Sequence, residues 1–129
     1  MSYNDYGIGS HPTAQDIVDG RRVEFNASGH VVYAPATRLG VGVSRISQKS
    51  GEDIGVAYWN KPGTHHIEVK GAIDIGDQVF AAANGTVSVL PAAAGDYVKV
   101  GVALEASAED GDVIEVLPVE SGKIVNVAA

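Results

Sequence analysis

The sequence has no cysteine in its 129 residues and few aromatic residues, with one Trp, five Tyr and two Phe. The missing cysteines exclude disulfides, thiolate metal sites and cysteine nucleophiles, so stability has to come from packing or assembly. No apolar run approaches the roughly 18 residues that a membrane-spanning helix needs. The first residues, MSYNDYGIGSHP, lack the basic and apolar regions of a signal peptide. The sequence therefore predicts a protein that is made in a cytoplasm and has no membrane partner.

Basic residues are also scarce, because 9 Lys and Arg stand against 16 Asp and Glu and give a net charge of −7. Nucleic-acid binding needs clustered Lys and Arg, and Arg21-Arg22 is the only adjacent basic pair in the chain. We therefore expect no nucleic-acid partner. A hydrophobic fraction of 45% and a charged fraction of 19% are typical of a globular protein with a buried core.

Glycine, by contrast, is abundant at 16 residues, and six of these residues stand in turn-forming dipeptides. Asn84-Gly85 and Asp110-Gly111 have the strongest turn signals, because Asn, Asp and Gly tolerate positive φ. Three turn glycines in the first half recur in the second half at offsets of 56, 60 and 59 residues; the pairs are Gly29 and Gly85, Gly51 and Gly111, and Gly63 and Gly122. A near-constant offset predicts an internal duplication, with repeats over about 21–70 and 77–129.

Period-two alternation between these turns predicts β-strands. In residues 98–104 the Val and Leu residues share one face, and Lys99, Gly101 and Ala103 share the other. The best helix candidate is short, at residues 13–18. We therefore expect an all-β domain over residues 21–129: a small barrel or sandwich in which two related strand–turn–strand repeats pack around a shared core.

Residues 1–20 lack strand alternation and are predicted to form an extended N-terminal arm. Tyr3, Tyr6 and Ile8 give this polar segment apolar area, so it either orders on a neighbour or is a frayed terminus. Trp59, the only Trp, is either a partner-facing anchor or part of the core. The predicted partner contacts are therefore Tyr3, Tyr6, Ile8, His11 and Trp59.

No catalytic motif is recognisable in the sequence, which has no Gly-x-Ser-x-Gly elbow, P-loop or dinucleotide fingerprint. His65 and His66 are adjacent, so in a strand their rings point to opposite faces, which is poor geometry for one metal ion. Asp110-Gly111-Asp112 lacks the further ligands of a calcium loop. We therefore expect no enzymatic activity, no catalytic or metal-binding residues and no cofactor.

Residues 72–118 carry three features in a row: Gly-Asp-x-Val at 76–79, Gly-Val-Ala-Leu-Glu at 101–105, and a Gly-Asp turn into a Val-rich strand at 111–116. In these features the chain resembles the small β-rich phage head decoration proteins, also called capsid cement proteins. The resemblance implies a structural virion protein that binds the exterior of an icosahedral phage capsid and stabilises it. It further implies the major capsid protein as a partner and a homo-oligomer, with a trimer favoured over a dimer. Such a protein would be made in the host cytoplasm and would end on the outer capsid surface.

A biotinyl/lipoyl-like carrier domain is the alternative, because Asn84-Gly85-Thr86-Val87 and the Gly-containing segment after it resemble that family too. This resemblance implies Lys70, on a hairpin, as the modified residue, yet Glu68-Val69-Lys70-Gly71 lacks the expected Met-Lys-Met or Asp-Lys-Ala context. A glycan- or receptor-binding β-module is a third class, for which the sequence has no aromatic cluster.

Overall fold

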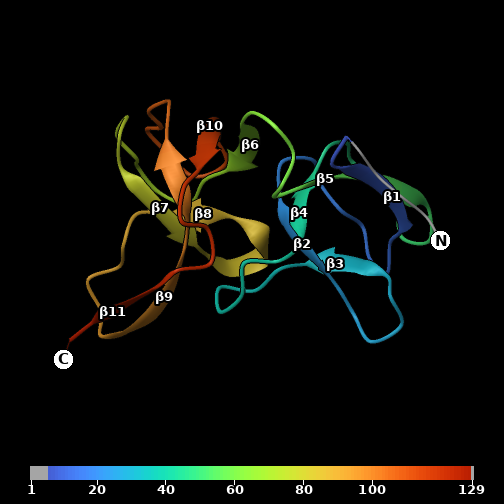
Figure 1. Ribbon diagram of the computed structural model, residues 1–129, viewed down its shortest axis with the longest axis horizontal. Helices are drawn as coiled ribbons and strands as arrows, with labels where there is room; N and C mark the ends of the chain where they lie inside the picture. Colours follow the sequence, from blue (N-terminus) through green and yellow to red (C-terminus); the bar gives the residue numbers. More distant parts are fainter. Residues whose placement is uncertain (1–5, 129) are drawn as a thin grey trace.

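A computed structural model describes residues 6–128 of the chain and shows two antiparallel β-sheets (Figure 1). The first sheet has the order β1-β5-β4-β2-β3 and contains β1 (Ile8–Pro12), β2 (Arg22–Phe25), β3 (Val31–Tyr33), β4 (Gly42–Ser44) and β5 (Asp53–Tyr58). The second has the order β6-β10-β9-β7-β8, with β11 also on β9, and contains β6 (His65–Glu68), β7 (Gln78–Ala81), β8 (Val87–Ser88), β9 (Gly95–Ala103), β10 (Val113–Pro118) and β11 (Ile124–Val127). The predicted all-β class is confirmed, and the sheets are open and sandwich-like rather than closed into a barrel.

The two sheets repeat one topology, because each strand of the first sheet occupies the place taken in the second sheet by the strand five positions later. The loops repeat as well. Ile17 exchanges two backbone hydrogen bonds with Gln48, and 56 residues after Ile17, Ile73 exchanges the same pair with Ser107. All six predicted turn glycines have positive φ. The prediction of two related halves is therefore confirmed at the level of strand order and local hydrogen bonding.

The prediction that residues 1–20 lie outside the sheets is wrong for residues 8–12, which form the edge strand β1 against β5. The repeated topology begins with β1 and β6, so the related halves run over residues 8–58 and 65–118 instead of 21–70 and 77–129. The sequence misleads here because β1 is an edge strand that pairs with β5 in the described part of the chain, and its mostly half-buried side chains show no alternation. β11 lies after the second half and has no counterpart in the first sheet.

The apolar core is also divided, whereas the sequence predicts a single shared core. One buried cluster belongs to the first sheet and includes Ile17, Ile54 and Val56. The other belongs to the second sheet, with Val43 of the first sheet as its one member from that side among the buried residues described. The short candidate helix at residues 13–18 does not form. The one helical element in residues 6–128 is a 3-10 turn, η1 (Ala83–Gly85).

Strand β9 departs from simple alternation because of a β-bulge. The pairing of β7 with β9 shifts register between Val79 and Phe80, which leaves Val100 as an extra residue on β9. A bulge reverses which face later side chains point to. Val98 and Val100 are therefore buried before it and Ala103 after it, while Val102 is half-exposed. The prediction that all Val and Leu residues of 98–104 share one face is wrong for that reason.

The pairing of β1 predicts the effect of an N-terminal truncation. A variant that begins at Gly20 loses the whole of β1 together with Thr13 and Ile17, both of which are 2% exposed. The Thr13 hydroxyl donates to the carbonyl oxygens of Lys49 and Glu52, each at 3.0 Å, so those acceptors lose their partner too. We expect this variant to lack a cooperatively folded first sheet, measured by amide NMR dispersion and thermal unfolding.

The control is a variant that begins at Gly7, which keeps β1 and the hydrogen bond from the Tyr58 amide to the Gly7 carbonyl oxygen. This variant should melt within a few degrees of the full chain. Equal melting temperatures for the full chain and the Gly20 variant would show that residues 21–129 fold alone, as the sequence suggests.

Candidate functional site

The two sheets meet along a seam in which Arg22 of β2 is fully buried. Its guanidinium pairs with no carboxylate of residues 6–128 and instead donates to backbone carbonyl oxygens on both sides of the seam. The acceptors at 2.7–3.5 Å are Ala34, Pro35, Arg38 and Leu39 in the first half, and Ala82 and Thr86 in the second. Burial lowers the pKa of Arg22 to about 10, against the opposing effect of Glu24. At neutral pH the side chain is therefore charged, and its hydrogen bonds join the two halves.

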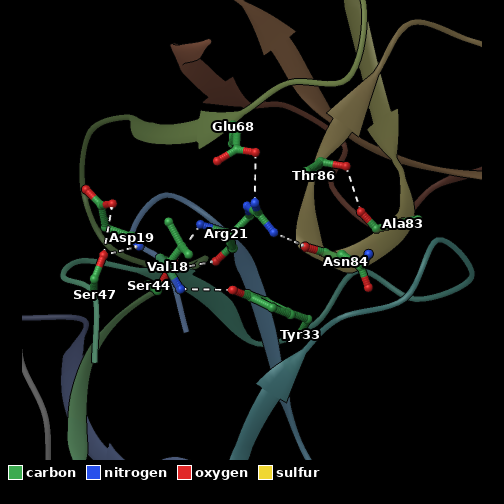
Figure 2. Close-up of polar contacts among 10 residues, drawn as sticks. All are labelled: Val18, Asp19, Arg21, Tyr33, Ser44, Ser47, Glu68, Ala83, Asn84 and Thr86. Carbon is green, nitrogen blue, oxygen red and sulfur yellow. Dashed lines mark hydrogen bonds and ion pairs between the residues drawn. The ribbon is translucent and has the colours of Figure 1, made fainter. Parts of the chain in front are cut away.

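Arg21, the residue directly before β2, forms a second contact between the two halves (Figure 2). Its Nη2 donates to Glu68 Oε2 at 2.8 Å and its Nη1 to the Asn84 carbonyl oxygen at 3.0 Å. The Tyr33 ring lies under the guanidinium, with its centroid 5.1 Å from Cζ. The Arg21 amide also donates to Ser44 Oγ. Arg21 and Arg22, the only adjacent basic pair in the sequence, therefore both join the two halves.

A cavity of about 370 Å³ lies at the same seam, and both halves contribute to its lining. Arg45 follows β4, Lys61 and Thr64 come from the connection between the halves, and His65 begins β6. Sites that bind ligands occur preferentially at such junctions between units.

Among the residues that line this seam cavity, His65 has a strongly shifted pKa. The residue is 3% exposed, and its Nε2 atom is buried with no hydrogen-bond partner in residues 6–128. Burial, with smaller contributions from the positive charge of Lys61 and from His66, lowers the pKa of His65 to about 4. The imidazole is therefore neutral at pH 7. His66, the next residue, is exposed, as expected for neighbours in a strand.

The lowered pKa of His65 predicts acid sensitivity. The folded state binds this proton only near pH 4, whereas the unfolded chain binds it near 6.5. Stability from His65 is therefore complete above pH 6.5 and is lost as the pH falls toward 4, by up to about 1.4 kcal/mol per pH unit. We expect His65→Gln to reduce the fall in melting temperature between pH 7 and pH 4.5.

The matched control is His30→Gln, which removes an exposed histidine outside the cavity lining and should leave that fall unchanged. If the His65 variant loses as much stability on acidification as the wild type, His65 does not titrate in this range.

The predicted contact residues within the described part of the chain differ in burial. Tyr3 lies outside the described residues, and Tyr6 is 81% exposed. Ile8 and His11 are half-buried on β1. Trp59 is partly buried against the core of the second sheet, and its Nε1 donates to the Gly40 carbonyl oxygen at 3.0 Å. Of the two expectations for Trp59, the structure agrees with the core position.

His11 belongs to a small aromatic group on the first sheet. Its Nε2 shares a 2.5 Å hydrogen bond with the Tyr58 hydroxyl, and its ring meets Phe25 edge-on at 4.9 Å. Gly9 lies between them, and a Cβ there would overlap the Tyr58 hydroxyl. These contacts tie β1 to β5 and β2, so His11 has a structural task whatever else it contacts.

Lys70 does not have the position that a carrier domain requires. It follows β6, and the strands that flank it, β6 and β7, pair with other strands instead of each other. Lys70 is therefore not at a hairpin tip. Within residues 6–128 no group of three or more His, Cys, Asp or Glu side chains is placed to hold a metal ion. That same part of the chain contains no helix long and apolar enough to cross a membrane.

Two sheets of one repeated topology, joined by Arg21 and the buried Arg22, define a duplicated all-β protein. A family model described as phage cement protein matches residues 10–118, which span nearly all of both halves. The chain belongs to the phage cement protein family. Its role is that of a structural component associated with the phage capsid.

The fold has a match among solved structures. The chain is similar to the head fiber gp8.5 N base in bacteriophage phi29, with a TM-score of 0.72 and 13% sequence identity. The match covers 90% of this chain and 96% of that chain. No curated protein sequence matches the chain. At this identity the solved structure supports the fold alone.

Proposed function

We propose that the protein decorates the exterior of an icosahedral phage capsid by binding the major capsid protein, and that it thereby stabilises the shell. The observation that carries the proposal is the family match over residues 10–118. The matched span coincides with the duplicated sheets, so the whole folded body, and not one motif in it, is typical of the family. No enzymatic step and no cofactor belong to this function.

The N-terminal segment is part of the proposed contact. Tyr6 is 81% exposed and lies just before the edge strand β1. A large aromatic side chain at such a position has apolar area to bury on a neighbour. β1 lies at the edge of its sheet, a position that suits strand addition by an extended segment of a partner. The predicted contacts Tyr3, Tyr6, Ile8 and His11 all belong to this segment or strand.

The proposed assembly is a homo-oligomer, with a trimer favoured over a dimer because shell decorations commonly sit at local three-fold positions. Val89 and Leu90, which are 39% and 40% exposed, line a groove of about 400 Å³ beside Val125 of β11. Contiguous exposed apolar side chains of this kind favour contact with another protein surface. Sedimentation equilibrium at micromolar concentration gives the native mass, and a monomer at every concentration would exclude self-assembly before shell binding.

The contact is tested by cosedimentation with empty expanded shells of the phage that encodes the protein. We expect the double variant Tyr3→Ser and Tyr6→Ser to fold normally and to occupy shells several-fold less than the wild type. A matched control is Tyr97→Ser, which changes a Tyr on β9, far from β1 in the fold (Figure 1). Equal occupancy by all three proteins would exclude the N-terminal contact, and no binding by the wild type would exclude the proposed function.

A further inference from the structure

The seam cavity gathers positive charge in an acidic protein. Its lining includes Arg45 and Lys61, and neither forms an ion pair within 4.0 Å with a carboxylate in residues 6–128. Most other basic side chains of the described chain are paired or, like Arg22, enclosed by carbonyl oxygens. Asp19 is the one carboxylate in the lining, and its oxygen already has the Ser47 hydroxyl at 3.3 Å. The lining therefore carries a net charge of about +1 in a chain of net charge −7.

His65 also lines the cavity, and its Nε2 is buried without a hydrogen-bond partner in the described residues. Because this nitrogen is buried, the two cations and not the imidazole provide the attraction for a ligand. Val43 and Ala57 supply an apolar floor. These apolar residues can pack against the short aliphatic part of a ligand, and the two cations can bind a negatively charged group at its end.

The geometry points to a carboxylate-binding site in the seam cavity, which takes an acidic side chain of the partner protein. Arg45 and Lys61 would hold the carboxylate oxygens through charge-assisted hydrogen bonds. A net charge of about +1 matches a singly charged carboxylate better than a doubly charged phosphate. A cationic pocket would also allow this acidic protein to bind an acidic segment of a shell subunit, which the rest of its negatively charged surface would repel.

This inference rests on the proposed function, and it extends the proposed contact surface to the seam. Gly7 packs against Lys61, because a Cβ at Gly7 would lie 2.7 Å from the Lys61 Cα. The exposed Tyr6 therefore directly precedes a residue that packs against Lys61 of the cavity lining. One partner segment could then contact Tyr6 and place an acidic side chain between Arg45 and Lys61.

The site is tested on the isolated full-length protein by amide NMR at pH 7 and low ionic strength. The probe is the capped peptide acetyl-Gly-Glu-Gly-amide, with acetyl-Gly-Gln-Gly-amide and inorganic phosphate as comparisons. We expect saturable shifts at Arg45, Lys61 and His65 with the Glu peptide, and binding at least about tenfold weaker for the Gln peptide. Shifts located elsewhere, equal binding of both peptides, or tighter binding of phosphate than of the Glu peptide would overturn the carboxylate site.

Matched variants separate the site from general charge. Arg45→Gln and Lys61→Gln should each weaken the Glu peptide about tenfold, whereas Lys70→Gln, which removes an exposed lysine outside the cavity lining, should not. On shells, the double variant of Arg45 and Lys61 should show lower occupancy than the Lys70 variant. If wild type and double variant decorate shells equally, the seam site is wrong while the proposed function stands. If the peptide binds at the seam but the wild type binds no shell, the proposed function fails while the carboxylate site stands.

Discussion

Replacing Arg22 with Met is expected to lower the melting temperature by about 10 °C or more, because the change removes the hydrogen bonds by which this side chain joins the two halves. Met fills a similar volume but donates no hydrogen bond, so the carbonyl oxygens of Arg38, Leu39 and Ala82 lose this donor. A buried carbonyl oxygen that loses its donor typically costs about 1–3 kcal/mol, and several such oxygens lose one here. Differential scanning calorimetry at pH 7 measures the effect directly.

Arg38→Met is the matched control for this prediction. The Arg38 side chain is 65% exposed and pairs with Glu24 at 2.9 Å, and exposed pairs of this kind contribute about 0–1 kcal/mol. Arg22→Lys is informative too, because an ammonium has three donors and lacks the fork that reaches both halves. A melting temperature for Arg22→Met within about 3 °C of wild type would mean that the stability of the protein does not depend on the Arg22 hydrogen bonds.

Replacing Gly42 or Gly101 with Ala is expected to destabilise the protein by about 2–4 kcal/mol in each case. At both positions a Cβ would overlap the carbonyl oxygen of the neighbouring strand, Ala57 for Gly42 and Leu117 for Gly101. That oxygen cannot retreat cheaply, because β4 pairs with β5 and β9 pairs with β10 at these places. Chemical denaturation of the two single variants gives the free energies of unfolding.

Gly55→Ala provides the control on a neighbouring strand. A Cβ at Gly55 meets only the Arg45 Cβ at 3.9 Å, an ordinary van der Waals contact, so we expect a change below about 1 kcal/mol. Similar large losses at Gly42 and Gly101 would confirm that the duplication extends to the close approach of paired backbones. A loss at one position and none at the other would show that the two sheets differ in packing where their topology agrees.

The sequence is most informative about turns. Turn glycines recur at nearly constant offsets, and the Gly-Val step at 42–43 matches that at 101–102, so the duplication is recognisable from the order of the residues alone. The reason for the Gly-Val match is not recognisable in that way. Gly42 and Gly101 are required because a backbone oxygen of the next strand occupies the space of a Cβ, and this depends on strand register.

The start of the first repeat is hard to predict because β1 shows no alternation. One signal is nevertheless present, since Ile17-x-x-Gly20 recurs as Ile73-x-x-Gly76, 56 residues later. Both glycines donate their amide hydrogen to the last residue of an equivalent strand: Gly20 to the Ser44 carbonyl oxygen of β4, and Gly76 to the Ala103 carbonyl oxygen of β9. That match places the first repeat boundary on the N-terminal side of residue 20.

The seam is not predictable from local patterns. Arg22 occupies a position that alternation assigns to the face opposite Val23, and local patterns do not show that segments of both halves cover this side chain. Arg45, Lys61 and His65 are separated in sequence and meet only because the 59–64 connection lies between the sheets. Charge composition predicts an acidic surface and gives no sign of a cationic cavity within it.

Decoration of the outer surface of a phage capsid is tested most directly by a cryo-electron microscopy map of expanded shells incubated with the pure protein. We predict added density on the outer shell surface at local three-fold positions, in which each copy of the protein has two lobes, one for each sheet. We also predict that the N-terminal segment and the seam face the shell. Density confined to the inner surface, or shells that remain bare at saturating protein, would contradict the proposed decoration.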